Sequence, residues 1–506
     1  MTIADFYKGK NVFITGGTGF LGQALIEKLL RSCPDVGTIY LLLRPKKNDT
    51  ARQRLEKLKN VPAFNIIREK NPEALDKLEP IDGDCCSVNL GLSESNRKLL
   101  IDNVNIIFHS AASVRFDDIL KYAILLNVRG TREVAKLALE LKNISMLVHI
   151  STTYCNCDRF LIEEKLYPSH GTWEEAIRLA EEYDEQILKV LSEKYISPMP
   201  NTYTYAKQLG EQVINDMCNK KIPTLILRPS IVISSKNEPF PGWNINFNGP
   251  VGLFIAAGKG LLRTVYGYNE ASQDMVPCDY VVKAIFIAVD DYNQSNTQEL
   301  EVYNLAQNDI LQMKQKEILT LGRNLLEETP FSTILWYPSI YITSCWYYFY
   351  ISVLLFHVLP ALFFDTLLRI FNKKPIVLIL QRKIYIANMI LAPFTKTSYQ
   401  IPNHKIMKAI ENVKDEDSPF ALDVHRHNYD EQYEYFVQAK NVAVKYLLRD
   451  EKDFELEKAK RVNYNYWIAH VALQTVLYGL LIWILFFKVD ILTVLYNRVI
   501  QYFENL

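Results

Sequence analysis

The sequence predicts an α/β protein with a Rossmann-type, doubly wound parallel sheet, a smaller and mostly helical C-terminal domain, and a C-terminal membrane helix. Residues 10–320 alternate short β-branched runs with longer helical patterns, which is typical of βαβ units. Near residue 330 the composition changes to a run rich in aromatic and aliphatic residues. Close to the C-terminus, the 21 residues from Trp467 to Phe487 contain only His470 as a possible charge, and this length matches a bilayer-spanning helix.

Apolar runs within the first part of the chain are the expected strands. They are Asn11–Thr15, Thr38–Leu43, Val104–His109, Met146–Ile150 and Pro223–Leu227. Helical patterns separate them, as parallel pairing requires. We therefore assign residues 1–320 to the Rossmann domain. Residues 330–371 are expected to form a hydrophobic, membrane-associated segment in which Pro338 and Pro360 break the apolar run.

Charge and cysteine usage exclude several classes of protein. Lys plus Arg equal Asp plus Glu at 57 each, so the chain lacks the basic field that a nucleic-acid partner requires. The eight cysteines include Cys85-Cys86 and Cys155-x-Cys157, spacings typical of neither a disulfide framework nor a zinc site. We interpret them as free thiols in a reducing compartment. His425-Arg426-His427 has no third ligand at a recognisable spacing, so we expect a surface turn and no metal.

A glycine-rich turn follows the first expected strand. The segment Thr15-Gly16-Gly17-Thr18-Gly19-Phe20-Leu21-Gly22 leads into an amphipathic helix that ends near Arg31. Gly16 and Gly19 permit a tight turn and close approach of a pyrophosphate, while Gly22 lets helix and strand pack closely. A strand before the turn and a helix after it favour a dinucleotide site over an ordinary glycine-rich turn.

The second strand ends at Arg44, with Lys46 and Lys47 close behind. An acidic residue at this place usually binds the ribose 2′-hydroxyl of NAD, whereas an arginine suits the 2′-phosphate of NADP. We therefore expect NADPH as the cofactor, the alternative being a solvated basic loop. Asp84 follows another expected strand, where it would contact the adenine or cap a turn or helix.

A tyrosine and a lysine are the first candidate catalytic residues. Tyr203 and Lys207 open a helical stretch, and their spacing of four puts both side chains on one helix face. A phenol with a pKa near 10 exchanges its proton poorly at neutral pH unless a cation stabilises the phenolate. We expect Lys207 to supply that cation, although Tyr-x-x-x-Lys alone is usually an ordinary exposed pair.

Hydroxyl side chains follow the fourth expected strand. Ser151 and Thr152 come directly after Ile150, at the carboxyl end of a central strand, where open α/β sheets hold their ligands. We expect Thr152 to bind a developing oxyanion, with Ser151 as the second candidate. Together with the glycine turn and the Tyr–Lys pair, they predict hydride transfer to a carbonyl-type carbon.

Taken together, these motifs resemble the extended short-chain dehydrogenase/reductases, and more narrowly the eukaryotic fatty acyl-CoA reductases. The matching stretches are Thr15–Gly22, Leu42–Arg44, His109–Asp117, Asn127-x-x-Gly130-Thr131, Ser151-Thr152, Tyr203–Lys207, Leu227–Val232, Pro241–Trp243, Asn248–Pro250 and Leu355–Ala361. They cover most of residues 10–290 and continue into a C-terminal domain of that family, placed at 356–455. Tyr154-Cys155-Asn156 departs from the commoner Ala-Tyr-x-Asn form but leaves the serine and threonine in place.

The resemblance implies NADPH-dependent reduction of a long-chain acyl-CoA to a primary alcohol through an aldehyde-level intermediate. It implies further cofactor contacts at Ala111, Asn127, Pro229 and Ile231. Asn127 would position Lys207 through water or, as an equal alternative, cap a helix. Lys207 would also hold the nicotinamide ribose.

The resemblance also bears on the acyl site and on rival functions. Phe254, Leu261 and Leu262 are candidates for an acyl tunnel, with core packing as the alternative. His357 is expected to be a packing residue rather than a ligand or a base. The nearest rival function is a membrane-bound sterol or hydroxysteroid dehydrogenase, and a more distant one is a non-catalytic nucleotide-binding scaffold.

The membrane assignment rests on the segment 467–487. Lys458, Lys460 and Arg461 precede it, so the positive-inside rule keeps the N-terminal side cytosolic. A hairpin within one leaflet is the alternative to a single crossing. Met1–Phe6 lacks the pattern of a signal peptide. We expect a cytosol-facing enzyme in a peroxisomal or endoplasmic reticulum membrane, and the earlier Ile334–Phe371 run should lie on the membrane surface or admit acyl chains.

Overall fold

The computed structural model describes residues 2–45, 49–247, 250–295, 297–307, 312–425, 428–450, 455–484 and 497–501. Its centre is a seven-stranded parallel sheet with strand order β10-β6-β5-β4-β1-β2-β3. The strands are β1 Asn11–Thr15, β2 Ile39–Leu43, β3 Leu78–Asp82, β4 Val104–His109, β5 Met146–Ile150, β6 Thr224–Pro229 and β10 Glu301–Leu305. The doubly wound sheet is therefore confirmed, and the five expected strands lie within two residues of their observed bounds.

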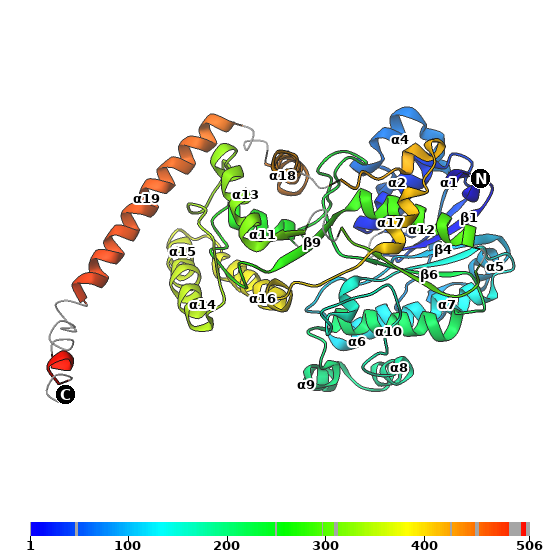
Figure 1. Cartoon of the computed structure of the whole chain (residues 1–506), viewed down its shortest axis with the longest axis horizontal. Coiled ribbons are helices and arrows are strands. Elements are labelled where there is room, and N and C mark those ends of the chain that lie inside the picture. The colour runs from blue at the N-terminus through cyan, green and yellow to red at the C-terminus, as the bar shows by residue number, and fades with distance from the viewer. Residues whose placement is uncertain are drawn as a thin grey trace.

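Helices cover both faces of this sheet (Figure 1). One face carries α2 (Phe20–Ser32) and α12 (Cys278–Ser295), and the other carries α7 (Gly130–Glu140) and α10 (Thr202–Cys218). Strand side chains alternate between the two faces, as the two-residue repeat of a strand requires. Val12 and Ile14 of β1 pack into one core cluster, whereas Phe13 packs into the other.

Smaller sheets and helices extend the chain away from the main sheet. A three-stranded sheet contains β7 (Ile231–Ile233), β9 (Ser272–Pro277) and β11 (Gln312–Lys314), and β8 (Thr264–Tyr266) pairs with β12 (Tyr341–Thr343). The helices that follow are α11 Pro250–Gly258, α13 Gln315–Glu328, α14 Trp346–Val353, α15 Leu359–Ile370, α16 Val377–Thr395, α17 His404–Glu411, α18 Tyr429–Val442 and α19 Leu456–Trp483. Of these, α17 returns to pack on α12 and β10 of the Rossmann domain.

The apolar run forms a continuous helix from Trp346 to Ile370. The expectation that Pro360 breaks this run is therefore wrong. The turn Leu354–Val358 just before the proline is π-helical. A π-turn changes the local hydrogen-bond pattern, which accommodates a residue that has no N–H to donate. Pro338 lies in the irregular segment before β12, outside any helix.

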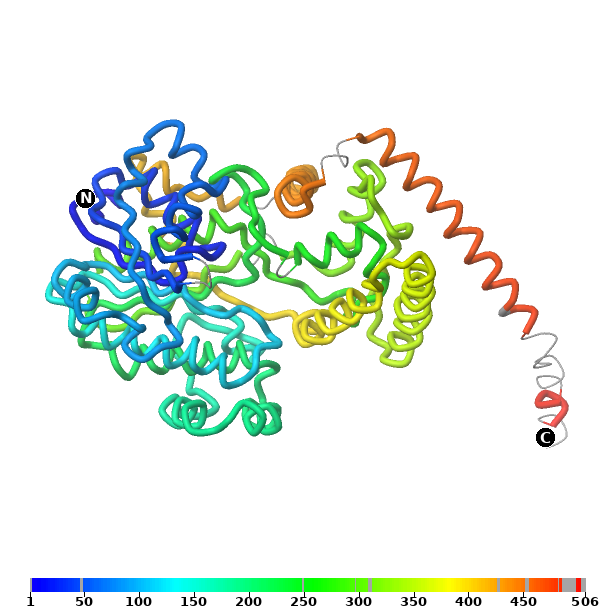
Figure 2. The backbone as a smooth tube through the Cα atoms, turned by 180° about the vertical axis from the view of Figure 1, so that it is seen from behind, coloured from blue at the N-terminus to red at the C-terminus, as the bar shows by residue number. Residues whose placement is uncertain are grey.

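Two helical stretches in the described part of the chain are long and apolar enough to cross a membrane, Trp346–Ile370 and Val377–Thr395. Helix α19 extends from the rest of the molecule as a single long helix (Figure 2). It contains most of the segment expected to span the bilayer, of which residues 485–487 lie outside the described residues.

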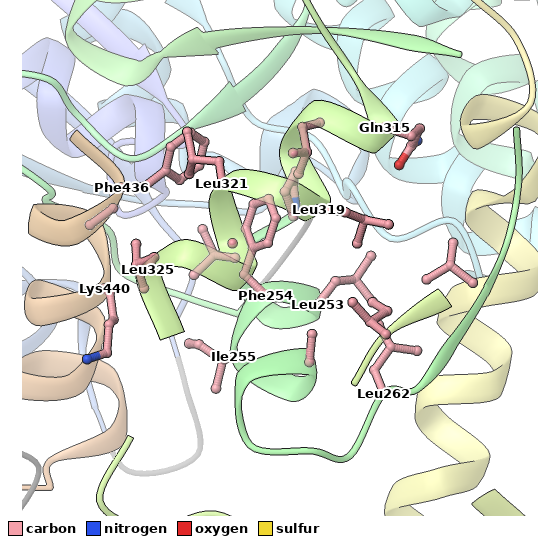
Figure 3. Close-up of a pocket in the computed structure, with 18 of the residues that line it drawn as sticks. Leu253, Phe254, Ile255, Leu262, Gln315, Leu319, Leu321, Leu325, Phe436 and Lys440 are labelled. Carbon is pink, nitrogen blue, oxygen red and sulfur yellow. The ribbon is translucent and has the colours of Figure 1, made fainter. Parts of the chain in front are cut away.

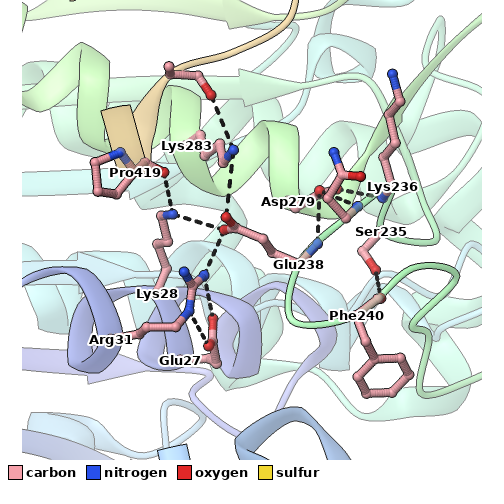
Figure 4. A network of polar contacts seen from close by, with 12 residues as sticks. Glu27, Lys28, Arg31, Ser235, Lys236, Glu238, Phe240, Asp279, Lys283 and Pro419 are labelled. Atoms are coloured by element: carbon pink, nitrogen blue, oxygen red, sulfur yellow. Dashed lines mark hydrogen bonds and ion pairs between the residues drawn. The ribbon is translucent and has the colours of Figure 1, made fainter. Parts of the chain in front are cut away.

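A buried charge network joins the Rossmann domain to the C-terminal region (Figure 4). The Glu238 carboxylate accepts from Lys28 at 2.8 Å and from Arg31 at 2.7 Å, both on α2. Lys28 also donates to the carbonyl of Pro419. Burial lowers the pKa of Lys28 to about 8 although the Glu238 charge opposes this shift. The network therefore connects three separate parts of the sequence at one face of α2.

Candidate active site

The candidate residues gather at the carboxyl edge of the main sheet, where β1, β4, β5 and β6 all end. Thr15 pairs with His109 across β1 and β4, and His109 pairs with His149 across β4 and β5. Ile150 then pairs with Leu227 across β5 and β6. Because the strands are parallel and in this register, the loops that follow them meet at one edge, the usual ligand site of an open α/β sheet.

Steric contacts explain why the turn after β1 needs its glycines. Gly16 has a φ of +79°, and a Cβ there would lie 2.7 Å from the backbone nitrogen of Ala111. A Cβ on Gly22 would lie 2.2 Å from the carbonyl oxygen of Gly16, so α2 could not approach the turn. Gly19 is the N-cap of α2 and has no side chain to bond the first amides of the helix. This exposed helix start fits the pyrophosphate of a dinucleotide.

Other turn residues support this geometry from the protein side. The buried Thr15 hydroxyl lies 2.7 Å from His109 Nδ1 and accepts from the Ala111 amide at 3.2 Å, which fixes the loop after β4. The Thr18 carbonyl accepts from the Gln23 side chain at 3.0 Å. Phe20 packs against the ring of Trp243 at 4.9 Å. Leu21 is partly buried against the core beside α2.

The end of β2 carries Arg44, whose side chain is 52% exposed and lies 3.6 Å from the Asp84 carboxylate. Asp84 also accepts from the Cys86 amide at 2.9 Å, as a residue that caps a turn does. The pair places a cation at the sheet position where the 2′-substituent of a bound dinucleotide is read. Lys46 and Lys47 lie outside the described residues.

Helix α10 presents Tyr203 and Lys207 toward the end of β5. Asn201 begins the helix by accepting from the Thr204 amide at 2.9 Å. The Tyr203 hydroxyl lies near the Thr152 side chain, which favours the charged form of the phenol. Thr152 is itself held by the Tyr154 amide, from which its hydroxyl accepts at 3.3 Å. The structure thus brings Tyr203 and Thr152 together.

Lys207 is buried, and its ammonium donates to the carbonyl of Ile150 at 2.6 Å. Burial lowers the pKa of Lys207 to about 8, against the attraction of Cys155 and Glu211. We expected Lys207 to lower the pKa of Tyr203, but burial instead raises that pKa above its ordinary value, against the opposing influence of the Thr152 side chain. Tyr203 is therefore a neutral phenol at physiological pH, the form that donates a proton.

Ser151 faces a different partner from Thr152. Its hydroxyl donates toward Cys155 Sγ at 3.7 Å, and Cys155 lies 3.1 Å from the Glu211 carboxylate. Glu211 forms a buried bidentate pair with Arg228, with distances of 2.8 and 2.7 Å. The Ser151 hydroxyl therefore belongs to a network that joins α10 to β6. Glu211 follows Lys207 by four residues, a spacing that could have placed it on the catalytic face of the helix from the sequence alone, whereas its partner Arg228 lies on another strand and is placed by the tertiary structure.

Asn127, Pro229 and Ile231 have distinct positions. The Asn127 side chain accepts from the Ser113 amide at 3.0 Å and donates to the Ser113 carbonyl at 3.2 Å, so it holds the loop after β4 in place. The alternative that Asn127 caps a helix is therefore wrong. The Pro229 carbonyl accepts from the Thr152 hydroxyl at 3.4 Å. Ile231 begins β7 and lines a cavity next to the candidate catalytic residues.

This cavity has a volume of about 310 Å³ and an almost wholly apolar lining (Figure 3). Phe254 and Leu262 line it, as expected for the acyl tunnel, whereas Leu261 is absent from the lining residues in the described part of the chain. Phe116 and Tyr154 also line the cavity, and the centroid of the Phe116 ring lies 5.5 Å from that of Tyr203. The role of Phe116 was missed because only tertiary structure brings its loop against α10.

A pair of buried histidines lies beneath Lys207. The rings of His109 and His149 are 5.2 Å apart. Burial, together with the Lys207 charge, lowers the pKa of His109 to about 3 and that of His149 well below its ordinary value. Both imidazoles are therefore neutral, and Lys207 is the cation of this region.

The helix start after β1, the Tyr–Lys face of α10 and the hydroxyl after β5 together define an oxidoreductase of the extended short-chain type that uses a nicotinamide cofactor. Comparison with known protein families supports this class of oxidoreductase. Two models described as "male sterility protein" match the chain, an NAD-binding model at residues 14–285 and a second model, named Sterile, at residues 356–450.

Curated relatives narrow this class. The chain is 35% identical over 482 residues to the Drosophila melanogaster fatty acyl-CoA reductase wat, an alignment that covers 95% of this chain and 92% of the relative. It is 34% identical over 473 residues to human fatty acyl-CoA reductase 1, covering 92% and 91%. The chain therefore belongs to the fatty acyl-CoA reductase family.

Solved structures show the same fold at lower identity. The terminal reductase domain of the myxalamid biosynthetic pathway matches with a TM-score of 0.56 and 18% identity, covering 87% of this chain and 91% of that one. A reductase domain of a nonribosomal peptide synthetase from Mycobacterium tuberculosis also matches with a TM-score of 0.56, at 19% identity, covering 88% and 95%. These matches support the assigned fold.

Proposed function

We propose that this protein reduces a long-chain fatty acyl-CoA to a primary alcohol and free CoA, using NADPH and a bound aldehyde-level intermediate. One observation carries the proposal: Phe116 lines the apolar cavity and also packs against the ring of Tyr203, whose hydroxyl lies near the Thr152 side chain. An acyl chain in the cavity would bring its polar head to this pair. The names of the curated relatives support the same substrate class.

The side chains divide the work of two successive reductions. When bound, NADPH supplies the hydride for each of them. In the first, negative charge develops on the thioester oxygen, which Thr152 and Tyr203 stabilise while Tyr203 gives it a proton. The hydroxyl of the resulting hemithioacetal then returns its proton to the tyrosinate as the carbon–sulfur bond breaks; CoA leaves as a thiolate with the electron pair of that bond and takes a proton from solvent, and an aldehyde remains. In the second, the aldehyde oxygen receives its proton by the same route and the alcohol forms.

Lys207 and Arg44 serve the cofactor in this proposal. The Lys207 ammonium is held by the Ile150 carbonyl, on the same helix face as Tyr203. In this proposal its charge stabilises the tyrosinate that remains after proton donation, and its ammonium also holds the nicotinamide ribose. Arg44 stands at the end of β2, where a 2′-phosphate would meet it. This is the basis for proposing NADPH over NADH.

We also place the enzyme on a membrane, with its Rossmann domain in the cytosol and with most of the segment that crosses the bilayer contained in α19. The basic residues Lys458, Lys460 and Arg461 begin α19, which supports a cytosolic N-terminal side. The target membrane in this proposal is peroxisomal or endoplasmic reticulum.

The direct test is to incubate the purified full chain with NADPH and palmitoyl-CoA and to identify the products over a series of acyl-CoA chain lengths. We expect hexadecanol and free CoA, with two NADPH oxidised per alcohol. A sterol or hydroxysteroid dehydrogenase would instead act on sterol substrates and leave palmitoyl-CoA intact. Absence of acyl-CoA reduction by a folded, NADPH-binding protein would overturn the proposed reaction.

A further inference from the structure

Helices α14 to α16 bury several polar side chains and expose many large apolar ones, unlike most helices of a soluble protein. The buried stripe of the helix from Trp346 to Ile370 contains the polar residues Ser352, His357 and Asp365. The outer face is apolar, with Tyr347 80% exposed and Phe363 61% exposed. In α16 the inward residues include Gln381 and Asn388, while Leu378, Ile379, Leu380 and Ile386 are exposed. A contiguous apolar surface of this kind marks a contact with lipid or protein.

The inward residues His357 and Asp365 find their hydrogen-bond partners within the protein itself. His357 Nδ1 lies 2.9 Å from the Gln381 side chain, which joins the two helices, and this confirms His357 as a packing residue. Asp365 accepts from the amides of Val377 and Leu378, at 2.9 Å each, and so caps α16. The helices therefore form a hairpin that satisfies these inward polar groups within the protein and exposes large apolar side chains outward, as a lipid-facing surface does.

Contacts along α16 set the orientation of this hairpin. Gln381 donates to the Leu261 carbonyl at 3.0 Å, Asn388 to the Thr264 carbonyl at 2.7 Å, and Thr395 to the Tyr266 carbonyl at 2.8 Å. Helix α16 is thus held against the enzyme body along its length and cannot stand across a bilayer while that body remains in water. Only the outer face of the hairpin can therefore enter the bilayer.

The basic residues near the hairpin indicate that its lipid partner is anionic. In a chain of zero formal net charge, residues 331–400 contain six Lys and Arg and a single acid, Asp365, which is buried in the hairpin. Lys373 and Lys374 are exposed in the turn between α15 and α16, and Arg382 and Lys383 are exposed on α16. None of these four is in an ion pair in the described part of the chain. Basic clusters at an apolar membrane-facing surface attract anionic headgroups.

We propose that the hairpin of α14, α15 and α16 inserts its outer face into a single leaflet of a bilayer and binds anionic phospholipid headgroups through Lys373, Lys374, Arg382 and Lys383. This surface is separate from α19, and it does not depend on the reaction proposed above. Leu391 and Phe394 of α16 also line the apolar cavity, so the inserted surface lies directly outside the cavity wall.

The test uses the full chain in vesicles of phosphatidylcholine, alone or mixed with phosphatidylserine. With the exposed Cys345 replaced by serine, a fluorophore is attached at Phe363→Cys or, as a matched control, at Val190→Cys on the exposed face of α9 (Glu185–Ile196). In phosphatidylserine vesicles we expect nitroxide-labelled lipid to quench the probe at position 363 and iodide to quench it several-fold less than at 190. Equal iodide quenching at both positions in both vesicles would overturn the insertion.

Two further variants test the headgroups and the single leaflet. Lys373→Glu with Lys374→Glu should reduce lipid quenching at position 363 in phosphatidylserine vesicles to its value in phosphatidylcholine, whereas Lys189→Glu with Lys194→Glu should not. Unchanged quenching in the first pair would refute headgroup binding. A membrane-impermeant maleimide should label Ile376→Cys to the same extent as Val190→Cys, and protection of position 376 until detergent is added would refute the single leaflet. NADPH oxidation with palmitoyl-CoA in detergent tests the reaction independently.

Discussion

At the scale of single residues, Tyr203 is in the right protonation state for a donor. Burial raises its pKa, so the phenol keeps its proton until charge develops on the substrate oxygen. Tyr203→Phe removes the phenolic hydroxyl, and with it the proton to be donated, while the volume of the side chain changes little. We expect turnover to fall about a hundredfold or more, the usual scale for losing a general acid, with NADPH binding nearly unchanged. The measurement is kcat beside the NADPH Kd, and full activity in purified Tyr203→Phe protein would end the proposed donor role.

Lys207 predicts a pH dependence. Its pKa is lowered to about 8 by burial, so the free enzyme loses the ammonium as pH rises through that value. If the cation is needed, kcat/KM should be flat below pH 8 and fall above it, because kcat/KM reports the free enzyme. Lys207→Arg keeps a charge and should remove this fall, although its activity will be lower. A profile that stays flat to pH 9.5 or so in the parent enzyme would exclude the requirement.

Arg44 decides the cofactor in our proposal. Arg44→Asp should weaken NADPH binding by about 2–3 kcal/mol, the scale of a lost hydrogen bond to a charged group. NADH lacks the 2′-phosphate and should be much less affected, which makes it the internal control. The measurement is the ratio of the two Kd values. If that ratio does not move, Arg44 is a surface residue and the argument for NADPH loses its main support.

At the scale of elements, the fit of α2 against the turn after β1 depends on Gly22. A Cβ there would lie 2.2 Å from the Gly16 carbonyl oxygen, which is backbone and cannot move aside cheaply. Gly22→Ala should therefore lower the Tm and weaken nucleotide binding together. The control is Gly322→Ala in α13, where a Cβ meets nothing within 4 Å and should add about 0.5–1 kcal/mol of helix stability. Normal NADPH affinity in Gly22→Ala would show that α2 has room to shift.

At the scale of the whole molecule, the two membrane surfaces should be separable. A chain that ends at Asn465 keeps the basic start of α19 but lacks the rest of that helix, and it retains the hairpin and the Rossmann domain. We expect it to move from the carbonate-resistant membrane pellet to a weaker association that salt or detergent disrupts, because surface charge is screened by salt. NADPH binding should persist. If the shortened chain remains carbonate-resistant, α19 is not the principal anchor and the Ile334–Phe371 run is inserted more deeply than one leaflet surface allows.

Those features of the fold and site that depend on neighbouring residues could be predicted from the sequence. The glycine turn before α2 and the spacing of Tyr203 and Lys207 are of this kind, since each is set by the geometry of one turn or one helix. The strand bounds followed from apolar runs for the same reason. The continuous helix through Pro360 could not be predicted, because a π-turn adjusts to its surroundings.

The sequence by itself determined the doubly wound sheet, the glycine turn and the helix face that carries Tyr203 and Lys207, because local backbone geometry and side-chain periodicity suffice for these. Only the tertiary structure decided which hydroxyl serves the site: Thr152 meets Tyr203, while Ser151 turns to Cys155. It also decided the cavity, whose lining extends from Phe116 to Asn463, and the sign of the Tyr203 pKa shift. Burial and contacts between distant segments set these features, and neither is encoded in any short stretch of the chain.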